Sequence, residues 1–142
     1  MATAAARGTS GGRLSLRHPA DPTRLRVLRR QVERWAAENG VPASAVTDLQ
    51  LALGEAVSNG VEHAYQDGDR GSVEVDLELR YLDDLLVIDV RVIDHGRWRP
   101  IPLHKGYRGR GLAIIDQLSR GLQIATSDRG TQLTFAVPVR QG

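Results

Sequence analysis

The spacing of apolar residues in the first third of the chain predicts a short strand followed by an amphipathic helix. Leu14 and Leu16 alternate with polar residues from Arg13 to His18, which is the period of a strand. Asp21 can cap the helix that follows, with Pro22 in its first turn. We expect this helix to run to about Glu38 and to stop at Asn39-Gly40.

A second, longer helix is predicted after Pro42, with Ser44 as its cap, ending near Tyr65. Its apolar and polar residues fall on opposite faces. The inward face holds Val46, Leu49, Leu53, Val57, Gly60 and Ala64, and the outward face holds Asp48, Glu55, Asn59, Glu62 and Gln66.

The remaining pattern predicts two hairpins with a loop and a helix between them. Apolar residues alternate from Ser72 to Tyr81, with Tyr81 on the inward side, and Leu85 to Ile93 forms a more apolar partner strand after a turn. A loop, a helix entered through glycines and a final hairpin follow: residues 94–107, Gly109–Ser119, and Leu122–Thr126 with Thr131–Val139.

This order of elements indicates an α/β fold. Strands and three helices in this sequence predict a two-layer α/β sandwich, in which a mixed, mostly antiparallel sheet carries the helices on one face. The other face is either solvated or used by a partner. We assign residues 13–140 to one domain and residues 1–12, which are small and polar, to a disordered N-terminal tail.

Composition narrows the class of protein. The chain has 142 residues and no cysteine, which excludes disulfides and thiolate metal sites. It has no apolar run long enough to span a membrane and no secretory signal, so we expect a cytoplasmic protein. The net charge of +2 and 4% aromatic residues argue against nucleic-acid binding. An arginine cluster between Arg24 and Arg34 is a solvated helix face, a contact for an acidic protein, or a nucleic-acid patch.

Glu55 and Asn59 lie four residues apart on the second helix and therefore share a face. A carboxylate beside an amide oxygen suits a magnesium–triphosphate site: one oxygen can enter the metal shell, and the other group can orient or deprotonate an attacking hydroxyl. The same pattern also occurs on ordinary helix surfaces. His63, four residues further, either lines the mouth of such a pocket or stays on the surface.

Two short motifs lie where predicted strands end or begin. In Asp94-His95-Gly96, the aspartate can accept a hydrogen bond from an exocyclic amine such as that of adenine, and Gly96 allows close approach to the backbone. In Gly130-Thr131, the threonine can offer its hydroxyl to a phosphate or to water beside the base. Each motif on its own also fits a plain turn.

The segment from Gly106 to Leu112 is the most specific motif. Three glycines lead into a helix and can offer bare backbone amides, at its positive end, to phosphate oxygens. Arg108 and Arg110 add charge that can neutralise phosphate or contact a partner. It is neither a Walker A loop nor a good dinucleotide fingerprint, and a flexible helix cap is the alternative. The residues that we assign here to phosphate binding are Gly106, Arg108, Gly109, Arg110, Gly111 and Leu112.

Together, these four motifs resemble in identity and order the GHKL superfamily of ATP-binding domains, which has the Bergerat fold. Glu55 and Asn59 match its first box, Asp94 and Gly96 its adenine box, and the three glycines its phosphate box. The run from Gly54 to Tyr65 is most similar to bacterial anti-sigma-factor serine/threonine kinases. One departure is Trp98, which stands where the family usually has a second glycine.

This resemblance implies an ATP-dependent serine/threonine kinase in transcription regulation, with ATP and Mg²⁺ as cofactors. Glu55 would be the base and Asn59 the Mg²⁺ ligand, Asp94 would read adenine, and the amides from Gly109 to Leu112 would hold the phosphates. The implied partners are a sigma factor and a small anti-anti-sigma protein of the STAS type, with a homodimer as the assembly. The alternatives are a non-catalytic ATP-binding module that switches protein binding, and a histidine-kinase catalytic domain.

Overall fold

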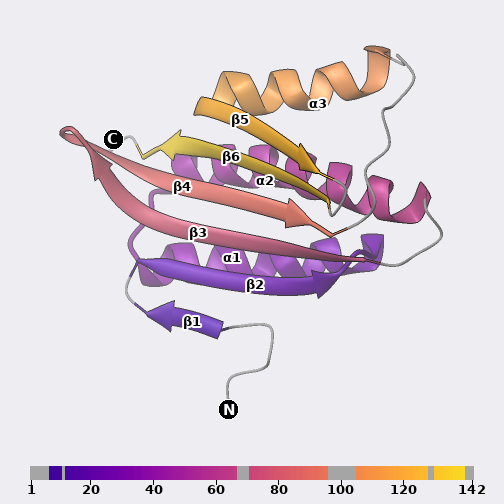
Figure 1. The fold of residues 1–142 in the computed structure, drawn as a ribbon. Coiled ribbons are helices and arrows are strands. Elements are labelled where there is room, and N and C mark those ends of the chain that lie inside the picture. Colours follow the sequence, from indigo (N-terminus) through magenta and orange to yellow (C-terminus); the bar gives the residue numbers. More distant parts are fainter. Residues whose placement is uncertain (1–6, 11, 67–70, 96–104, 128–129, 140–142) are drawn as a thin grey trace.

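The computed structural model describes residues 7–10, 12–66, 71–95, 105–127 and 130–139, with the backbone alone at residues 7–10, 60–66 and 105–111. These residues form a single sheet with helices on one side (Figure 1). The elements are, in order, β1 (Arg7–Ser10), β2 (Arg13–Pro19), the 3₁₀ turn η1 (Pro22–Arg24), α1 (Leu25–Glu38), α2 (Ala43–Gln66), β3 (Ser72–Leu82), β4 (Leu85–Asp94), α3 (Lys105–Leu118), β5 (Arg120–Ser127) and β6 (Gly130–Pro138).

The sheet has six strands in the order β1-β2-β3-β4-β6-β5. The mostly antiparallel sheet that we predicted is confirmed, but "mixed" is wrong for the described strands, because all five pairings are antiparallel. The reason is the crossover after β4. The chain returns through α3 and β5, and then places β6, not β5, beside β4. A parallel β4–β5 pair is thereby avoided.

The core lies between the sheet and the three helices. Alternate residues of β2, β3, β4 and β6 point to the helix side, and their side chains are buried there against one stripe of each helix. Trp35 of α1, Leu49 and Leu53 of α2 and Ile115 of α3 are at most 1% exposed. This single cluster confirms the two-layer arrangement, with the helices on one face.

The boundaries of α1 follow the predicted signals. Asp21 accepts a hydrogen bond from the backbone N–H of Thr23 at 3.0 Å and thereby caps η1, which leads directly into α1. The helix ends at Asn39, and Gly40 follows with a φ of +69°, a value that glycine adopts without strain. Ser44, by contrast, is not a cap, because α2 already begins at Ala43.

The predicted N-terminal tail contains structure. Residues 7–10, which we assigned to a disordered segment, form β1 and pair with β2. No alternation of apolar and polar residues marks this strand, because its residues are polar or glycine and the strand lies at an edge of the sheet. The rest of that tail lies outside the described residues.

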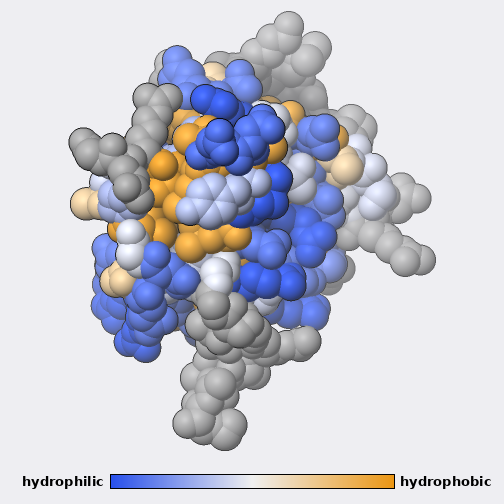
Figure 2. Space-filling model, turned by 90° about the vertical axis from the view of Figure 1, so that its left-hand side faces the viewer, coloured by the Kyte–Doolittle hydropathy of each residue, from blue (hydrophilic) through white to orange (hydrophobic). Residues whose placement is uncertain are grey.

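Tyr81 is the clearest error in the predicted core. Its position in the alternation of β3 is inward, yet its side chain is 70% exposed, and the neighbouring Leu82 is 37% exposed. Both residues belong to the end of the β3–β4 hairpin, which extends past the start of β2 at Arg13, the partner of Glu78. Figure 2 views the molecule from the side that carries this hairpin and shows an apolar area surrounded by polar residues.

Candidate nucleotide site

The antiparallel register of β4 and β6 brings two predicted site residues together. Asp94 is the last residue of β4, and its direct partner on β6 is Thr131. Asp94 continues the alternate residues Val90 and Val92, which point to the helix side. Asp94 is 4% exposed and Thr131 is 8% exposed, so a carboxyl group and a hydroxyl group are both buried at the end of an apolar face.

The Oγ1 atom of Thr131 is fully buried and makes no hydrogen bond with the described residues. Leaving such a group unsatisfied costs about 1–3 kcal/mol. Within the described part of the chain, the site therefore has one buried hydroxyl without a hydrogen-bond partner, beside the Asp94 carboxylate. It fits a ligand with polar edges, such as a purine base or the water bound to it.

Gly130 lies directly against the backbone of Asp94. A Cβ atom at this position would overlap the Asp94 carbonyl oxygen, and it would lie 2.9 Å from the carbonyl carbon and 3.2 Å from Cα of His95. The φ of Gly130 is +142°, which side-chain-bearing residues rarely adopt. In the sequence, Gly130 was part of the Gly130-Thr131 motif, with a hairpin turn as the alternative, but had no role of its own. The structure shows that its lack of a side chain lets β6 close on the strand end that carries Asp94.

Glu55 and Asn59 lie on α2, which packs against β4, β6 and α3. Both side chains are half-buried and share one side of the helix, as their spacing predicts. Ala52 and Ala56, which point toward the core beside them, are at most 1% exposed. Leu51, one turn before Glu55, is 54% exposed, so this part of α2 also borders solvent. Glu55 is thus placed where both an internal ligand and an external protein could approach it.

The glycine-rich motif adopts a different structure from the one predicted. Helix α3 begins at Lys105, four residues before the predicted start at Gly109. The amides of residues 109–112 therefore lie inside the helix, where they bond to carbonyls one turn earlier. The amides of the first three helical residues, including that of Gly106, have no partner within the helix. Glycine disfavours helices, but buried Ile115 and the partly buried Leu112 and Leu118 anchor α3 on the core.

Several predicted residues can be placed only in part. Gly96 lies outside the described residues, as does Trp98. The backbone of His63 belongs to α2, and the backbones of Arg108, Gly109, Arg110 and Gly111 belong to α3. Figure 1 shows that the end of β4, the start of α3, the start of β6 and the C-terminal part of α2 all lie at one end of the molecule. The four motifs therefore converge on one end of the helix-covered face.

Two residues near this end were missed in the sequence. His95, which follows Asp94, places its Nε2 atom 2.5 Å from Oε2 of Glu74, and its backbone N–H donates to the carbonyl of Ser72 at 3.0 Å. Both partners belong to β3. The sequence contains no signal for this pair, because the two residues are 21 positions apart and meet only through the strand register.

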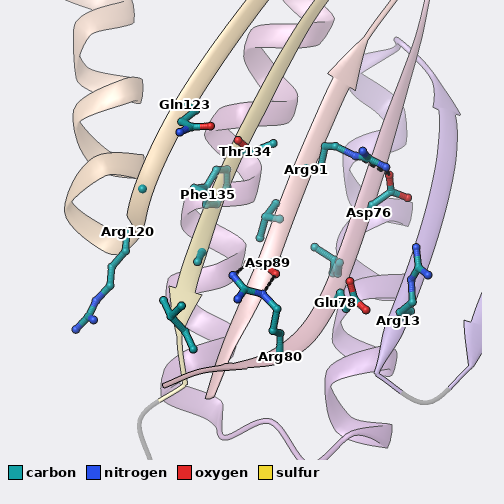
Figure 3. A pocket seen from close by; sticks show the side chains of 15 residues that line it. Arg13, Asp76, Glu78, Arg80, Asp89, Arg91, Arg120, Gln123, Thr134 and Phe135 are labelled. Carbon is teal, nitrogen blue, oxygen red and sulfur yellow. Dashed lines mark hydrogen bonds and ion pairs between the residues drawn. The ribbon is translucent and has the colours of Figure 1, made fainter. Parts of the chain in front are cut away.

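The open face of the sheet carries a separate, polar groove of about 680 Å³ (Figure 3). It contains none of the predicted site residues. Its central charges are paired across strands, Arg80 with Asp89 and Arg91 with Asp76, and Asp76 also accepts a hydrogen bond from Ser15 at 2.6 Å. The hydrogen bond from Arg80 to Asp89 raises the pKa of Arg80 above its usual value. This groove has the character of a protein surface and not of a nucleotide site.

The described residues provide no preformed metal centre. They contain no group of three or more His, Cys, Asp or Glu side chains that could hold a metal ion. A magnesium ion at this end of the fold would need phosphate oxygens as ligands, in addition to a group such as the Asn59 amide. No helix among the described residues has the length and apolar character needed to cross a membrane.

Comparison with known proteins identifies the class. Residues 18–137 match the family described as the histidine kinase-like ATPase domain. This span contains every described motif of the site, and the chain therefore belongs to that family.

Within this class, the chain is similar to proteins named serine-protein kinase RsbW. It is 34% identical over 88 residues to the protein of Listeria monocytogenes serotype 4a, an alignment that covers 62% of this chain and 54% of that protein. It is 29% identical over 112 residues to the protein of Bacillus licheniformis, covering 76% and 66%. The chain thus spans about half to two thirds of these relatives.

A solved structure supports the same assignment. The RsbU and RsbW domains of Rv1364c from Mycobacterium tuberculosis match with a TM-score of 0.64 and 27% identity. The match covers 90% of this chain and 33% of that one. The predicted α/β sandwich and the predicted family are both confirmed by these comparisons.

Proposed function

We propose that this chain is an ATP-dependent serine/threonine protein kinase that also acts as an anti-sigma regulatory factor. The observation that supports this most strongly is the buried, unpartnered Thr131 hydroxyl opposite Asp94, within a domain of the histidine kinase-like ATPase family. The similarity to RsbW-named kinases supports the choice of serine or threonine as acceptor.

The proposed chemistry needs few side chains, because phosphoryl transfer depends mainly on positioning and charge neutralisation. Asp94 accepts a hydrogen bond from the adenine amine, and Thr131 completes the polar edge of that pocket. Asn59 would hold the Mg²⁺, which would supply positive charge to neutralise the phosphates. Glu55 accepts the proton of the acceptor hydroxyl. The oxygen of that hydroxyl bonds to the γ-phosphorus, and the bond between the γ-phosphorus and the ADP leaving group breaks.

The start of α3 is the proposed phosphate-binding element. In the structure, the amides without a partner in the helix are those of its first three residues, which include Gly106. The backbone amides from Gly109 to Leu112, which the sequence predicts to hold the phosphates, could contact them only if the start of α3 unwound. We therefore assign the first turn and its positive dipole end to the phosphates.

The proposed partners rest on the resemblance of the sequence to anti-sigma-factor kinases. We propose that a sigma factor is sequestered and that a small STAS-type anti-anti-sigma protein is the phosphoacceptor, in the cytoplasm of a bacterium. We also propose a homodimer, for which the open sheet face with its cross-strand ion pairs offers a surface of mixed charge. Sedimentation of the purified chain would test the dimer.

The function is tested by recovering the acceptor. Purified protein is used to capture partners with and without Mg-ATP, and the bound proteins are analysed by mass spectrometry for phosphoserine and phosphothreonine. The expected result is one small bound protein that becomes phosphorylated with ATP and remains unmodified when the Glu55→Gln variant is used. A partner that binds in an ATP-dependent way but is never phosphorylated would instead favour the non-catalytic switch.

A further inference from the structure

The end of β4 depends on few contacts, although it carries the proposed adenine reader. Asp94 is the last strand residue, and its neighbours in the ladder are Val73 on β3 and Thr131 on β6. Beyond it, the regular pairing stops. The backbone of the next residue, His95, is one of the features that set the position of the Asp94 carboxylate.

His95 connects this strand end to β3 by two bonds. Its backbone N–H donates to the carbonyl of Ser72 at 3.0 Å, and its Nε2 lies 2.5 Å from Oε2 of Glu74. Glu74 alternates with the buried residues Val73 and Val75, so its side chain is on the open face of the sheet. The imidazole is therefore bonded on the face opposite to the pocket and does not reach the nucleotide itself.

The other side of the same strand end is closed by β6. Gly130 packs so tightly against the Asp94–His95 backbone that no Cβ atom would fit. The strand end is thus held between a backbone contact from β6 and a side-chain pair with β3. A displacement away from β3 would have to break the pair of His95 with Glu74.

We propose that His95 is a positioning residue for nucleotide selection: through Glu74, it fixes the backbone of Asp94 and so sets the preference of the site for adenine. This inference rests on the proposed function. It concerns the pair of His95 and Glu74, which the strand register brings together, and not a residue that contacts the nucleotide.

The alternative is an ordinary surface ion pair, since the two side chains are 40% and 31% exposed. Such pairs contribute little to folding. The free energy of unfolding therefore cannot distinguish the two interpretations, whereas the preference of the site for one base over another can. Adenine offers an amine to Asp94, whereas hypoxanthine has a carbonyl there, so a displaced Asp94 should weaken binding of Mg-ADP more than binding of Mg-IDP.

The experiment measures the dissociation constants of Mg-ADP and Mg-IDP for the full chain by calorimetry or competition. For His95→Ala, we expect Mg-ADP to bind about fivefold more weakly and Mg-IDP nearly as before, so that the selectivity ratio falls. His95→Gln can still donate to Glu74 and should restore most of the ratio. Arg91→Ala is the matched control, because it removes an ion pair between β4 and β3 on the same open face.

The outcomes separate this inference from the proposed function. Wild-type protein that binds neither nucleotide would contradict the function and this inference together. Wild-type protein that prefers Mg-ADP, with an unchanged ratio in His95→Ala, would overturn the positioning role alone. An equal loss for both nucleotides in His95→Ala, or the same fall in ratio in Arg91→Ala, would also overturn it.

Discussion

The contact between Gly130 and the end of β4 gives the sharpest structural prediction. In Gly130→Ala, the new methyl group would overlap the Asp94 carbonyl and crowd Cα of His95 at 3.2 Å. The backbone would also have to keep a φ of +142° with a side chain present, or change it. The strained backbone costs about 1–3 kcal/mol. Forcing a methyl group into a packed position costs about 1–3 kcal/mol more.

We therefore expect Gly130→Ala to lower the free energy of unfolding by about 2–6 kcal/mol, a large part of the stability of a single domain. Urea unfolding of purified protein measures this quantity. The relief of the overlap moves Asp94, so we also expect Mg-ADP to bind about tenfold more weakly in the folded fraction.

Gly121→Ala is the matched control. Gly121 also has a positive φ, +67°, but a Cβ atom there would meet nothing within 4 Å. Its substitution should cost only the backbone term, about 1–2 kcal/mol, and leave Mg-ADP binding unchanged. Equal destabilisation and equal nucleotide affinity in the two variants would refute the tight packing of Gly130 against the strand end.

Three further substitutions test separate parts of the account. Thr131→Val removes an unpartnered buried hydroxyl, so it should raise the free energy of unfolding of the nucleotide-free protein by about 1 kcal/mol and weaken Mg-ADP binding about tenfold; a destabilised variant with normal affinity would contradict this. Glu55→Gln should reduce phosphate transfer to the acceptor at least about a hundredfold while Mg-ADP affinity is retained, and a variant with normal turnover would exclude Glu55 as the base. Tyr81→Ser should change the free energy of unfolding by no more than about 0.5 kcal/mol, because the ring is 70% exposed; a loss typical of a core residue would show that this exposure is wrong.

Local pattern was sufficient to predict most elements of this fold. The period of two from Ser72 and the caps at Asp21 and Gly40 depend on neighbouring residues, and the corresponding strand, 3₁₀ turn and helix end were found. The order of the strands could not be predicted in the same way. Whether β5 or β6 lies beside β4 is decided by how α3 packs on the core, and not by the sequence of either strand.

The errors have the same physical origin. Tyr81 alternates correctly but extends beyond the start of β2, so no local rule could show that it is exposed. The first residues of α3, which include Gly106, were predicted as a loop because glycine disfavours helices, yet burial of Ile115 outweighs that preference. Strand β1 has no apolar pattern and depends on pairing with β2.

The features of the candidate site also differ in whether local sequence could predict them. The shared face of Glu55 and Asn59 follows from helix geometry and could be predicted. The pairing of Asp94 with Thr131, the packing of Gly130 and the contact between His95 and Glu74 all depend on strand register. The sequence could name some of these residues, but it could not show that they meet.

The most direct test of the central claim is equilibrium dialysis of radiolabelled Mg-ATP against the purified, folded chain, with Asp94→Ala in parallel. The account predicts saturable binding of one nucleotide per chain in the wild type and a severe loss in the variant. Retention of no nucleotide by folded wild-type protein, or equal retention by both proteins, would contradict a nucleotide site at the end of β4.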